Sequence, residues 1–322
     1  MSKTLIVIII FLSSISSYSQ LYVRNDNYIF VNDKVIFVED NIGLQETDSK
    51  FYLRNEAQLL QGNGTTGNSG LGQLSIFQTG TTHEYAYNYW CSPVGNNSLS
   101  LGNEVFRANL IDESTGLITS QNAQFTTDPE GFIEDISGTT TPLTISSEWL
   151  YTFENASQYS GWLYQSETGN ISPGLGFTMK GIRGSGSNQT YDFRGKPNNG
   201  TITNTVTENI WTLIGNPYPS AVDALAYIHD VDNAAAINGV LYFWEQDLSV
   251  FSHNLADYVG GYALYTISSD GLVETYIHAP FNTYNSDGTI NTAGSPRSSG
   301  KNLGRYIPVA VSYTHLTLPT IA

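Results

Sequence analysis

The sequence predicts an all-β protein, with a short β-solenoid-like or meander region at the N-terminus, then β-sandwich or jelly-roll-like repeats, and very little helix. Short β-branched and aromatic runs are separated throughout by Gly, Asn, Asp and Pro, which is typical of strands and turns. Segments with a helical period are nearly absent. A pattern of strands also occurs twice after residue 80. The clearest strand-like runs are 28–31, 34–38, 50–53, 73–77 and 240–244.

Only two segments favour a helix, and both are short. Ser220 is placed to cap a helix over residues 221–228. A second helix is predicted over residues 232–236, where alanines follow Asp232 and Asn233.

Three β regions are predicted along the chain. Residues 20–80 form an N-terminal β-repeat region whose closely spaced strands fit the rungs of a small β-helix, each rung burying a row of apolar side chains against the next. A meander of hairpins fits the same residues. Residues 81–190 and 191–310 are predicted to form a first and a second β module.

The two modules contain the repeated unit. Each unit has an aromatic strand that ends in a Pro turn, then an aromatic strand that ends in Glu, then a strand marked by Gly. Proline ends the opening strand because it has no backbone N–H to donate to a sheet. The first copy covers 89–94, 149–154 and 171–178, and the second covers 211–219, 241–245 and 258–265. The turn at 195–200 and an alternating strand predicted over 201–206 connect the copies.

Charge and cysteine content exclude several classes of function. The formal net charge is −16, from 13 Lys+Arg and 29 Asp+Glu, so nucleic acid and anionic membranes would be repelled. Cys91 is the only cysteine, which excludes intramolecular disulfides and multi-cysteine metal sites. The chain is therefore expected to be held together by core packing alone.

The N-terminus has the three parts of a secretory signal peptide. Lys3 precedes the apolar run 5–12, and Ser17-Tyr18-Ser19 supplies small residues at a cleavage site. We expect residues 1–19 to be removed before Gln20. The apolar run is shorter than the ~20 residues that span a bilayer, and no later run approaches that length. The mature protein is expected to be extracellular or on the outer cell surface, with the export machinery as a partner and no transmembrane segment.

Several motifs resemble those of a known group of proteins. The run W-T-L-I-G-N-P-Y-P-S at 211–220 is followed by I-N-G-V-L-Y-F-W at 237–244 and Y-V-G-G-Y-A at 258–263. Together with the turn at 195–200 and Ser92-Pro93-Val94, they resemble secreted surface proteins of Bacteroidota exported by the type IX system. The resemblance covers roughly residues 85–310. It implies release or attachment at the cell surface, and a C-terminal sorting domain that is missing from this sequence.

The last residues suggest a reason for the missing domain. Residues 311–322 resemble the translated sequencing-adapter tail found on many metagenomic gene sequences. They stand where the group has a different continuation after Tyr306-Ile307-Pro308-Val309. We therefore expect an artefactual tail on a truncated gene. The alternative is a genuine C-terminal strand with a Pro turn.

No residue is predicted to be catalytic, which favours a role other than that of an enzyme. The glycine-rich stretch 62–67 has the letters of a dinucleotide-binding loop but is not followed by a helix. There is no G-x-S-x-G motif and no metal-binding spacing of histidines. Glu154 and Glu245 occupy equivalent positions in the two repeats, which favours a structural role over a glycosidase pair.

Two kinds of binding residue remain. Asp230, Asp232 and Asp287 lie in oxygen-rich loops that suit calcium, although metal-free turns explain the same residues. No other cofactor is expected. Trp162, after the turn-like Ser160-Gly161, and Tyr218 are the predicted ligand-binding aromatics. The other repeated aromatics, such as Trp211 and Trp244, favour the core.

These observations predict a secreted or cell-surface, non-catalytic β-protein that binds glycans, surface proteins or other partners in adhesion. The alternative is an accessory region of a polysaccharide-degrading glycoside hydrolase or lyase. A spacer stalk without a ligand is a third possibility.

Overall fold

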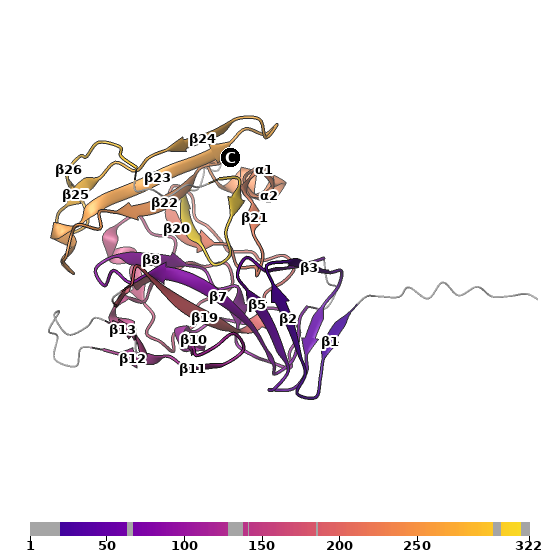
Figure 1. Cartoon of the computed structure of the whole chain (residues 1–322). Helices are drawn as coiled ribbons and strands as arrows, with labels where there is room; N and C mark the ends of the chain where they lie inside the picture. The colour runs from indigo at the N-terminus through magenta and orange to yellow at the C-terminus, as the bar shows by residue number, and fades with distance from the viewer. Residues whose placement is uncertain are drawn as a thin grey trace, which may run out of the picture.

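The computed structural model describes residues 20–62, 67–127, 138–140, 142–184, 186–298 and 304–316. Within these residues the fold is all-β, as predicted (Figure 1). The only α-helices among them are α1 (Ala224–His229) and α2 (Val231–Ala236). The predicted signal peptide, the centre of the stretch 62–67 and residues 317–322 lie outside the described residues.

The N-terminal region is a β-solenoid, which decides between the two predicted alternatives. Its strands pair in parallel, whereas a meander of hairpins would pair them antiparallel. Leu21 lies opposite Ile42 and Val35 lies opposite Gln58, so each rung takes about 22 residues. The first rung has β1 (Leu21–Val23), β2 (Tyr28–Asn32) and β3 (Val35–Val38), and the second has β4 (Ile42–Leu44), β5 (Lys50–Arg54) and β6 (Gln58–Gln61).

One long strand joins the solenoid to the rest of the protein. β7 (Gln73–Thr81) continues the solenoid by pairing in parallel with β5, and its other edge pairs antiparallel with β19 (Asn188–Pro197). Figure 1 shows β7 and β19 crossing the centre of the molecule. The strand order is β11-β10-β19-β7-β5-β2, and β9 pairs with the end of β19. The added strands are β9 (Val94–Gly95), β10 (Ile111–Ser114) and β11 (Ser120–Asn122).

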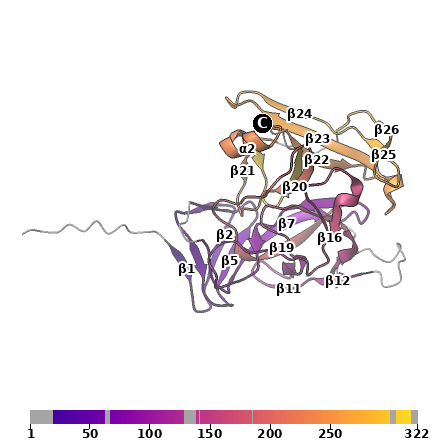
Figure 2. The ribbon, with the colours of Figure 1, turned by 180° about the vertical axis from the view of Figure 1, so that it is seen from behind.

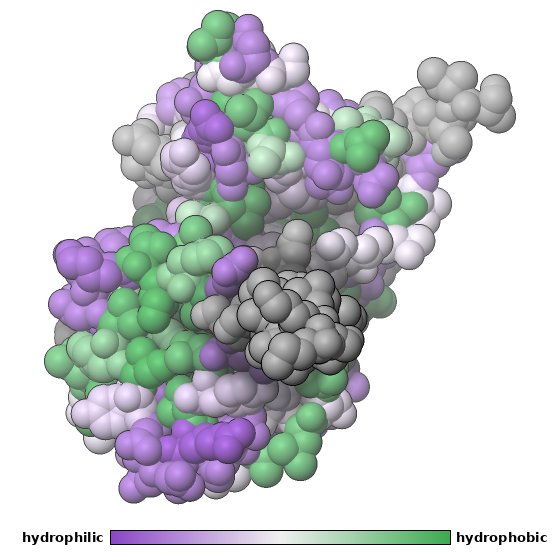
Figure 3. Space-filling view, turned by 90° about the vertical axis from the view of Figure 1, so that its right-hand side faces the viewer, coloured by the Kyte–Doolittle hydropathy of each residue, from purple (hydrophilic) through white to green (hydrophobic). Residues whose placement is uncertain are grey.

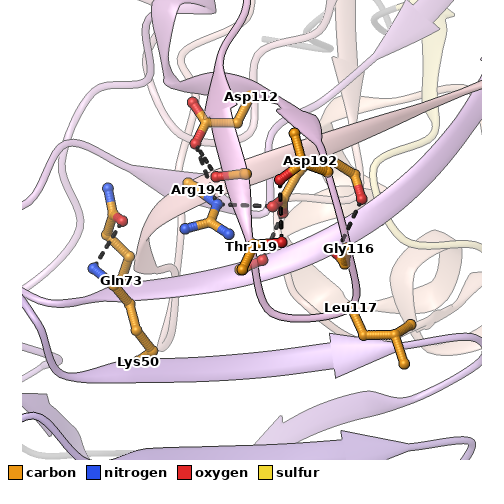
Figure 4. A network of polar contacts seen from close by, with 12 residues as sticks. Lys50, Gln73, Asp112, Gly116, Leu117, Thr119, Asp192 and Arg194 are labelled. Carbon is orange, nitrogen blue, oxygen red and sulfur yellow. Dashed lines mark hydrogen bonds and ion pairs between the residues drawn. The ribbon is translucent and has the colours of Figure 1, made fainter.

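A buried polar network crosses this sheet. The Arg194 guanidinium lies 2.7 Å from an oxygen of Asp192 and 3.3 Å from one of Asp112, as Figure 4 shows. The Ser75 hydroxyl donates to the other Asp192 oxygen at 2.6 Å, and Arg54 donates to Ser75 Oγ at 2.8 Å. Because buried charges are costly unless they are paired, this network fixes how the solenoid sits on β19.

The rest of the chain forms two further main sheets. In the smaller, the order is β16-β15-β17-β8, with β8 (Tyr87–Trp90), β15 (Tyr151–Phe153), β16 (Trp162–Tyr164) and β17 (Phe177–Lys180). In the larger, the order is β20-β28-β22-β23-β25-β26, with β24 also on β23. Figures 1 and 2 show the larger sheet lying above the level of β7 and β8. Its strands are β20 (Trp211–Gly215), β22 (Leu241–Gln246), β23 (Val259–Ile267), β24 (Glu274–Ile277), β25 (Asn282–Tyr284), β26 (Ile290–Thr292) and β28 (Ser312–Leu316).

Smaller sheets complete the fold. One has the order β12-β14-β13-β18, with β12 (Gln124–Thr126), β13 (Gly138–Thr140), β14 (Leu143–Ser146) and β18 (Ile182–Arg183). Another pairs β21 (Val222–Asp223) with β27 (Tyr306–Ile307). Two local predictions are wrong. Residues 201–206 form no strand, and the cap of α1 is Asp223, whose Oδ1 accepts from Leu225 N at 2.9 Å, instead of Ser220.

The repeated units are only partly alike in their pairing. The second and third strands pair antiparallel in both copies, as β15 with β17 and β22 with β23. The opening strand differs, because β8 pairs with β17 whereas β20 pairs with β28. β28, within the stretch predicted to be an adapter-derived tail, lies between β20 and β22, and its Tyr313 is buried.

The two proline turns lie side by side and are joined by one asparagine. The Asn198 Nδ2 donates to Ser92 O at 3.2 Å and to Pro217 O at 3.0 Å. Asn198 is buried, so water cannot replace its side chain as the donor to these two carbonyls. The predicted turn at 195–200 therefore acts as the link between the two repeat units.

Replacing Asn198 by alanine should lower the free energy of unfolding by about 1–3 kcal/mol, because two buried carbonyls lose a donor. Chemical denaturation measures this. Asn199→Ala is the matched control, since the Asn199 Nδ2 makes one long contact, 3.4 Å from Gly62 O. Equal stability of the two variants would contradict the linking role of Asn198.

One face of the solenoid carries exposed apolar side chains. Val35 and Phe37 on β3 are 58% and 64% exposed, and Leu60 on the neighbouring β6 is 39% exposed. Phe37 lies opposite Leu60 in the register. Figure 3 shows hydrophobic side chains gathered on the lower half of the molecule, seen from the solenoid side. Nothing in the described residues covers this face.

Candidate functional site

A cavity of about 470 Å³ lies between the smaller and the larger of the two main sheets. Its lining is mainly aromatic and includes every tryptophan of the chain except Trp90. Small polar residues complete it. The aromatic lining residues are Tyr87, Tyr89, Trp149, Tyr151, Phe153, Tyr159, Trp162, Trp211, Trp244, Tyr258, Tyr262 and Tyr284. We call it the aromatic cavity.

The two repeat units supply equivalent strands to opposite sides of the aromatic cavity. Tyr87 and Tyr89 come from β8, and Trp211 comes from β20, the matching opening strand. Phe153 and Trp244 occupy the same position, one residue before the repeated Glu, in β15 and β22. The duplication thus places one set of aromatic side chains opposite a second set.

Ring contacts hold these side chains at fixed angles. Trp162 packs against Phe153 at 5.0 Å between ring centres and meets Tyr89 edge-on at 6.3 Å. Trp244 contacts Tyr89 at 6.5 Å and Tyr262 at 5.2 Å. Tilted and edge-to-face contacts are the favoured geometries for aromatic pairs, so the wall is a packed, pre-formed surface.

The aromatic cavity is uncharged. None of its lining residues, all within the described part of the chain, is acidic or basic. Burial raises the pKa of Tyr87, Tyr89 and Tyr262, so their hydroxyls stay protonated at any physiological pH, with Tyr87 hydrogen-bonded to Tyr258 and Tyr89 to Tyr262. The site can therefore offer aromatic faces and neutral hydroxyl groups to a ligand.

A buried lysine lies behind one wall of the aromatic cavity. Lys180 Nζ is 3.6 Å from the centre of the Trp149 ring and about 5 Å from those of Tyr87 and Tyr258. It also lies 2.5 Å from the Tyr258 hydroxyl and 2.9 Å from His253 Nδ1. Burial lowers the pKa of Lys180 to about 6. The ring faces act in the opposite direction because they attract the ammonium.

Comparison with known proteins identifies one family. A family model described as "Domain of unknown function (DUF8693)" matches residues 132–295, half of the chain. The chain belongs to this family. No curated protein and no solved structure matches it significantly. The DUF8693 segment crosses the predicted module boundary at 190/191, which also falls within β19.

The DUF8693 segment contains nearly the whole aromatic cavity. Every lining residue falls within it except Tyr87 and Tyr89 of β8 and Thr314 of β28. The segment is thus completed by one strand that precedes it and one that follows it. Among the described residues, no helix is both long and apolar enough to cross a membrane.

The two predicted ligand-binding aromatics lie in different places. Trp162, directly after a short 3-10 turn, lines the aromatic cavity. Tyr218 lies outside it, and its hydroxyl donates to Gly200 O at 2.8 Å beside the proline turns. Trp211 and Trp244 also line the cavity, which the sequence did not indicate because their repetition favoured the core.

The carboxylates of two of the three predicted calcium residues, Asp230 and Asp287, are used in local contacts. The Asp230 carboxylate caps α2 by accepting from Asp232 N and Asn233 N. Asp287 Oδ1 accepts from the backbone N–H of Thr289 at 3.0 Å and from its hydroxyl at 2.6 Å. Across the described ranges, no group of three or more His, Cys, Asp or Glu side chains is arranged to hold a metal ion.

Glu245 and Cys91, two other candidates for chemistry, are buried, whereas Glu154 is only half-buried. Glu245 has no exposed surface and accepts from the Tyr276 hydroxyl at 2.5 Å, in keeping with the structural role predicted for this repeated position. Cys91 is also fully buried, and burial raises the pKa of its thiol, which makes a thiolate unavailable.

Proposed function

We propose that this chain is a secreted or cell-surface, non-catalytic protein that binds neutral glycans in the aromatic cavity. The observation that carries the proposal is a pre-formed, uncharged cavity lined by Trp and Tyr from both repeat units. Ligand sites are typically concave and largely apolar, with a few polar groups that orient the ligand.

The chemistry of a sugar ring matches this lining. A pyranose has faces made of C–H groups that pack on aromatic rings, and a rim of hydroxyls that need hydrogen-bond partners. Trp162, Trp149 and Trp244 supply ring faces. Gln158, Ser160 and Thr178 in the same lining supply polar groups. The net charge of −16 disfavours strongly anionic glycans as ligands.

The sequence supports a location for this activity. The signal peptide predicted over residues 1–19 and the motifs resembling type IX-exported surface proteins support export to the cell surface. A glycan-binding surface protein would serve adhesion. It would equally serve as the accessory region of a polysaccharide-degrading enzyme, which is the second candidate, and turnover of a bound polysaccharide by the intact protein would favour it.

Replacing Trp162 by alanine should weaken binding of a neutral oligosaccharide about tenfold or more, because a ring face at the ligand is lost. Isothermal titration calorimetry against plant, algal and bacterial oligosaccharides measures the affinity. Tyr306→Ala is the control, because Tyr306 is 63% exposed and lies outside the aromatic cavity.

Two results would count against glycan binding. One is the absence of any binding to the oligosaccharide panel by the unaltered protein. The other is an equal affinity of the Trp162→Ala variant and the unaltered protein for the same ligand, since this would place the bound sugar elsewhere.

A further inference from the structure

A second cavity, of about 710 Å³, lies beside the aromatic cavity. Tyr87, Tyr89 and Trp244 line both cavities. Strand β8 separates them, because side chains alternate along a strand. Asn88 and Trp90, which alternate with the two tyrosines, line the second cavity and not the first. We call this second space the polar cavity.

Four residues that line the polar cavity each carry a buried side-chain atom without a hydrogen-bond partner in the described chain. Asn88 Nδ2, Trp90 Nε1, Gln246 Oε1 and Ser312 Oγ have no hydrogen-bond partner among the described residues. Trp90, Gln246 and Ser312 are only 5%, 8% and 3% exposed. A buried group that stays unsatisfied costs about 1–3 kcal/mol, so a ligand hydroxyl or a water that pairs with these atoms would be stabilised.

These four residues provide a mixture of donors and acceptors. The Trp90 ring N–H and Asn88 Nδ2 can only donate, and Gln246 Oε1 can only accept, while the Ser312 hydroxyl can do both. A sugar fits such a set because each of its hydroxyls both donates and accepts. The charged residues of the lining, Asp247 and Arg297, form an ion pair with each other. The lining therefore has no net charge that would require an ionic ligand.

We propose that the polar cavity is a second subsite that binds a hydroxyl-rich unit of the same glycan that occupies the aromatic cavity. This inference rests on the proposed function. The ligand is then an oligosaccharide long enough to reach both sides of the wall formed by Tyr87, Tyr89 and Trp244. The competing occupant of the polar cavity is ordered water alone.

Ser312→Ala and Trp90→Phe test the polar cavity with little disturbance of the fold. Each removes a polar atom that bonds to no described residue, and phenylalanine keeps an aromatic ring in place. Ser146→Ala is a matched control, because Ser146 Oγ is also buried and without a partner in the described chain but lines neither cavity. Thermal unfolding verifies that every variant folds.

Calorimetry with a series from disaccharide to hexasaccharide, of the type that the unaltered protein binds, gives the result. We expect Ser312→Ala and Trp90→Phe each to weaken hexasaccharide binding about five- to tenfold, the effect of one lost hydrogen bond. Disaccharide binding and the Ser146→Ala variant should be unchanged, whereas Trp162→Ala should weaken every length.

The outcomes separate the two proposals. Unaltered affinities of Ser312→Ala and Trp90→Phe at every length, with Trp162→Ala still impaired, would overturn the second subsite and leave the aromatic cavity as the glycan site. An affinity that does not rise with ligand length would also overturn it. Absence of binding at every length would overturn the proposed function itself.

Discussion

Replacing Asp192 by leucine is expected to lower the free energy of unfolding by about 3–5 kcal/mol. Asp192 has no exposed surface and accepts from Arg194 and Ser75 at 2.7 Å and 2.6 Å. Burial raises the pKa of Asp192, and the positive charge of Arg194 opposes this rise. Removing the carboxylate leaves Arg194 and the neighbouring Arg54 buried with less negative charge to balance them.

Urea or guanidinium denaturation followed by tryptophan fluorescence measures this loss. The matched control is Arg183→Leu, which breaks an ion pair with Glu84 in which Arg183 is 61% exposed. Exposed pairs contribute about 0–1 kcal/mol, so this control should unfold close to the unaltered protein. A similar small change for Asp192→Leu would show that the buried network does not hold β7 against β19.

Replacing Lys180 by methionine is expected to stabilise the protein by about 2–4 kcal/mol near pH 6–7 and to flatten its dependence on pH. The pKa of Lys180 is lowered from 10.5 to about 6 by burial. Between these values the unfolded chain holds a proton that the folded chain has released. The stability connected with Lys180 is therefore present above pH 10.5 and is lost as the pH falls through 6.

Unfolding curves from pH 6.5 to pH 10 test this expectation. The free energy of unfolding of the methionine variant should exceed that of the unaltered protein most at the acid end of this range. The two curves of free energy against pH should converge toward pH 10. Lys34→Met is the control, since the side chain of Lys34 is 78% exposed. His253, whose pKa is lowered to about 4 by burial and by the charge of Lys180, contacts Lys180 directly, so the comparison is made above pH 6.5, where His253 is neutral in both the folded and the unfolded chain. Parallel curves for the two proteins would refute the assignment of this pH dependence to Lys180.

Local features of the fold could be predicted from the sequence because short-range chemistry decides them. The runs 28–31, 50–53 and 73–77 lie in strands, and 34–38 and 240–244 do so except for their first residues, since β-branched and aromatic residues between turn formers favour extended backbone. The helix near 221–228 was also expected. The predicted first residue of this helix was wrong because Ser220 and Asp223 are both good capping residues. Only the pairing of β21 with β27, which keeps Val222 and Asp223 extended, selects Asp223 as the cap.

Features that depend on distant partners could not be predicted. Alternating side chains fit the rungs of a solenoid and the strands of hairpins equally well. The choice depends on the path of the chain, which returns so that Lys50 lies opposite Tyr28 in a parallel pair. Trp162 was singled out because it follows a local turn, and it lies half-buried in the lining of the aromatic cavity. Trp211 and Trp244 were assigned to the core because one repeat unit alone does not reveal that a second unit faces it across a cavity.

The pairing of β7 with β19 has a consequence for the order in which the protein folds. Ser75 and Asp192 are separated by 117 residues, and their contact closes a loop that contains most of the first module. Closing so long a loop is entropically costly, and folds rich in such contacts form slowly. During synthesis, the N-terminal half therefore lacks its central partner strand until β19 has been made, and β7 cannot complete its pairing before then.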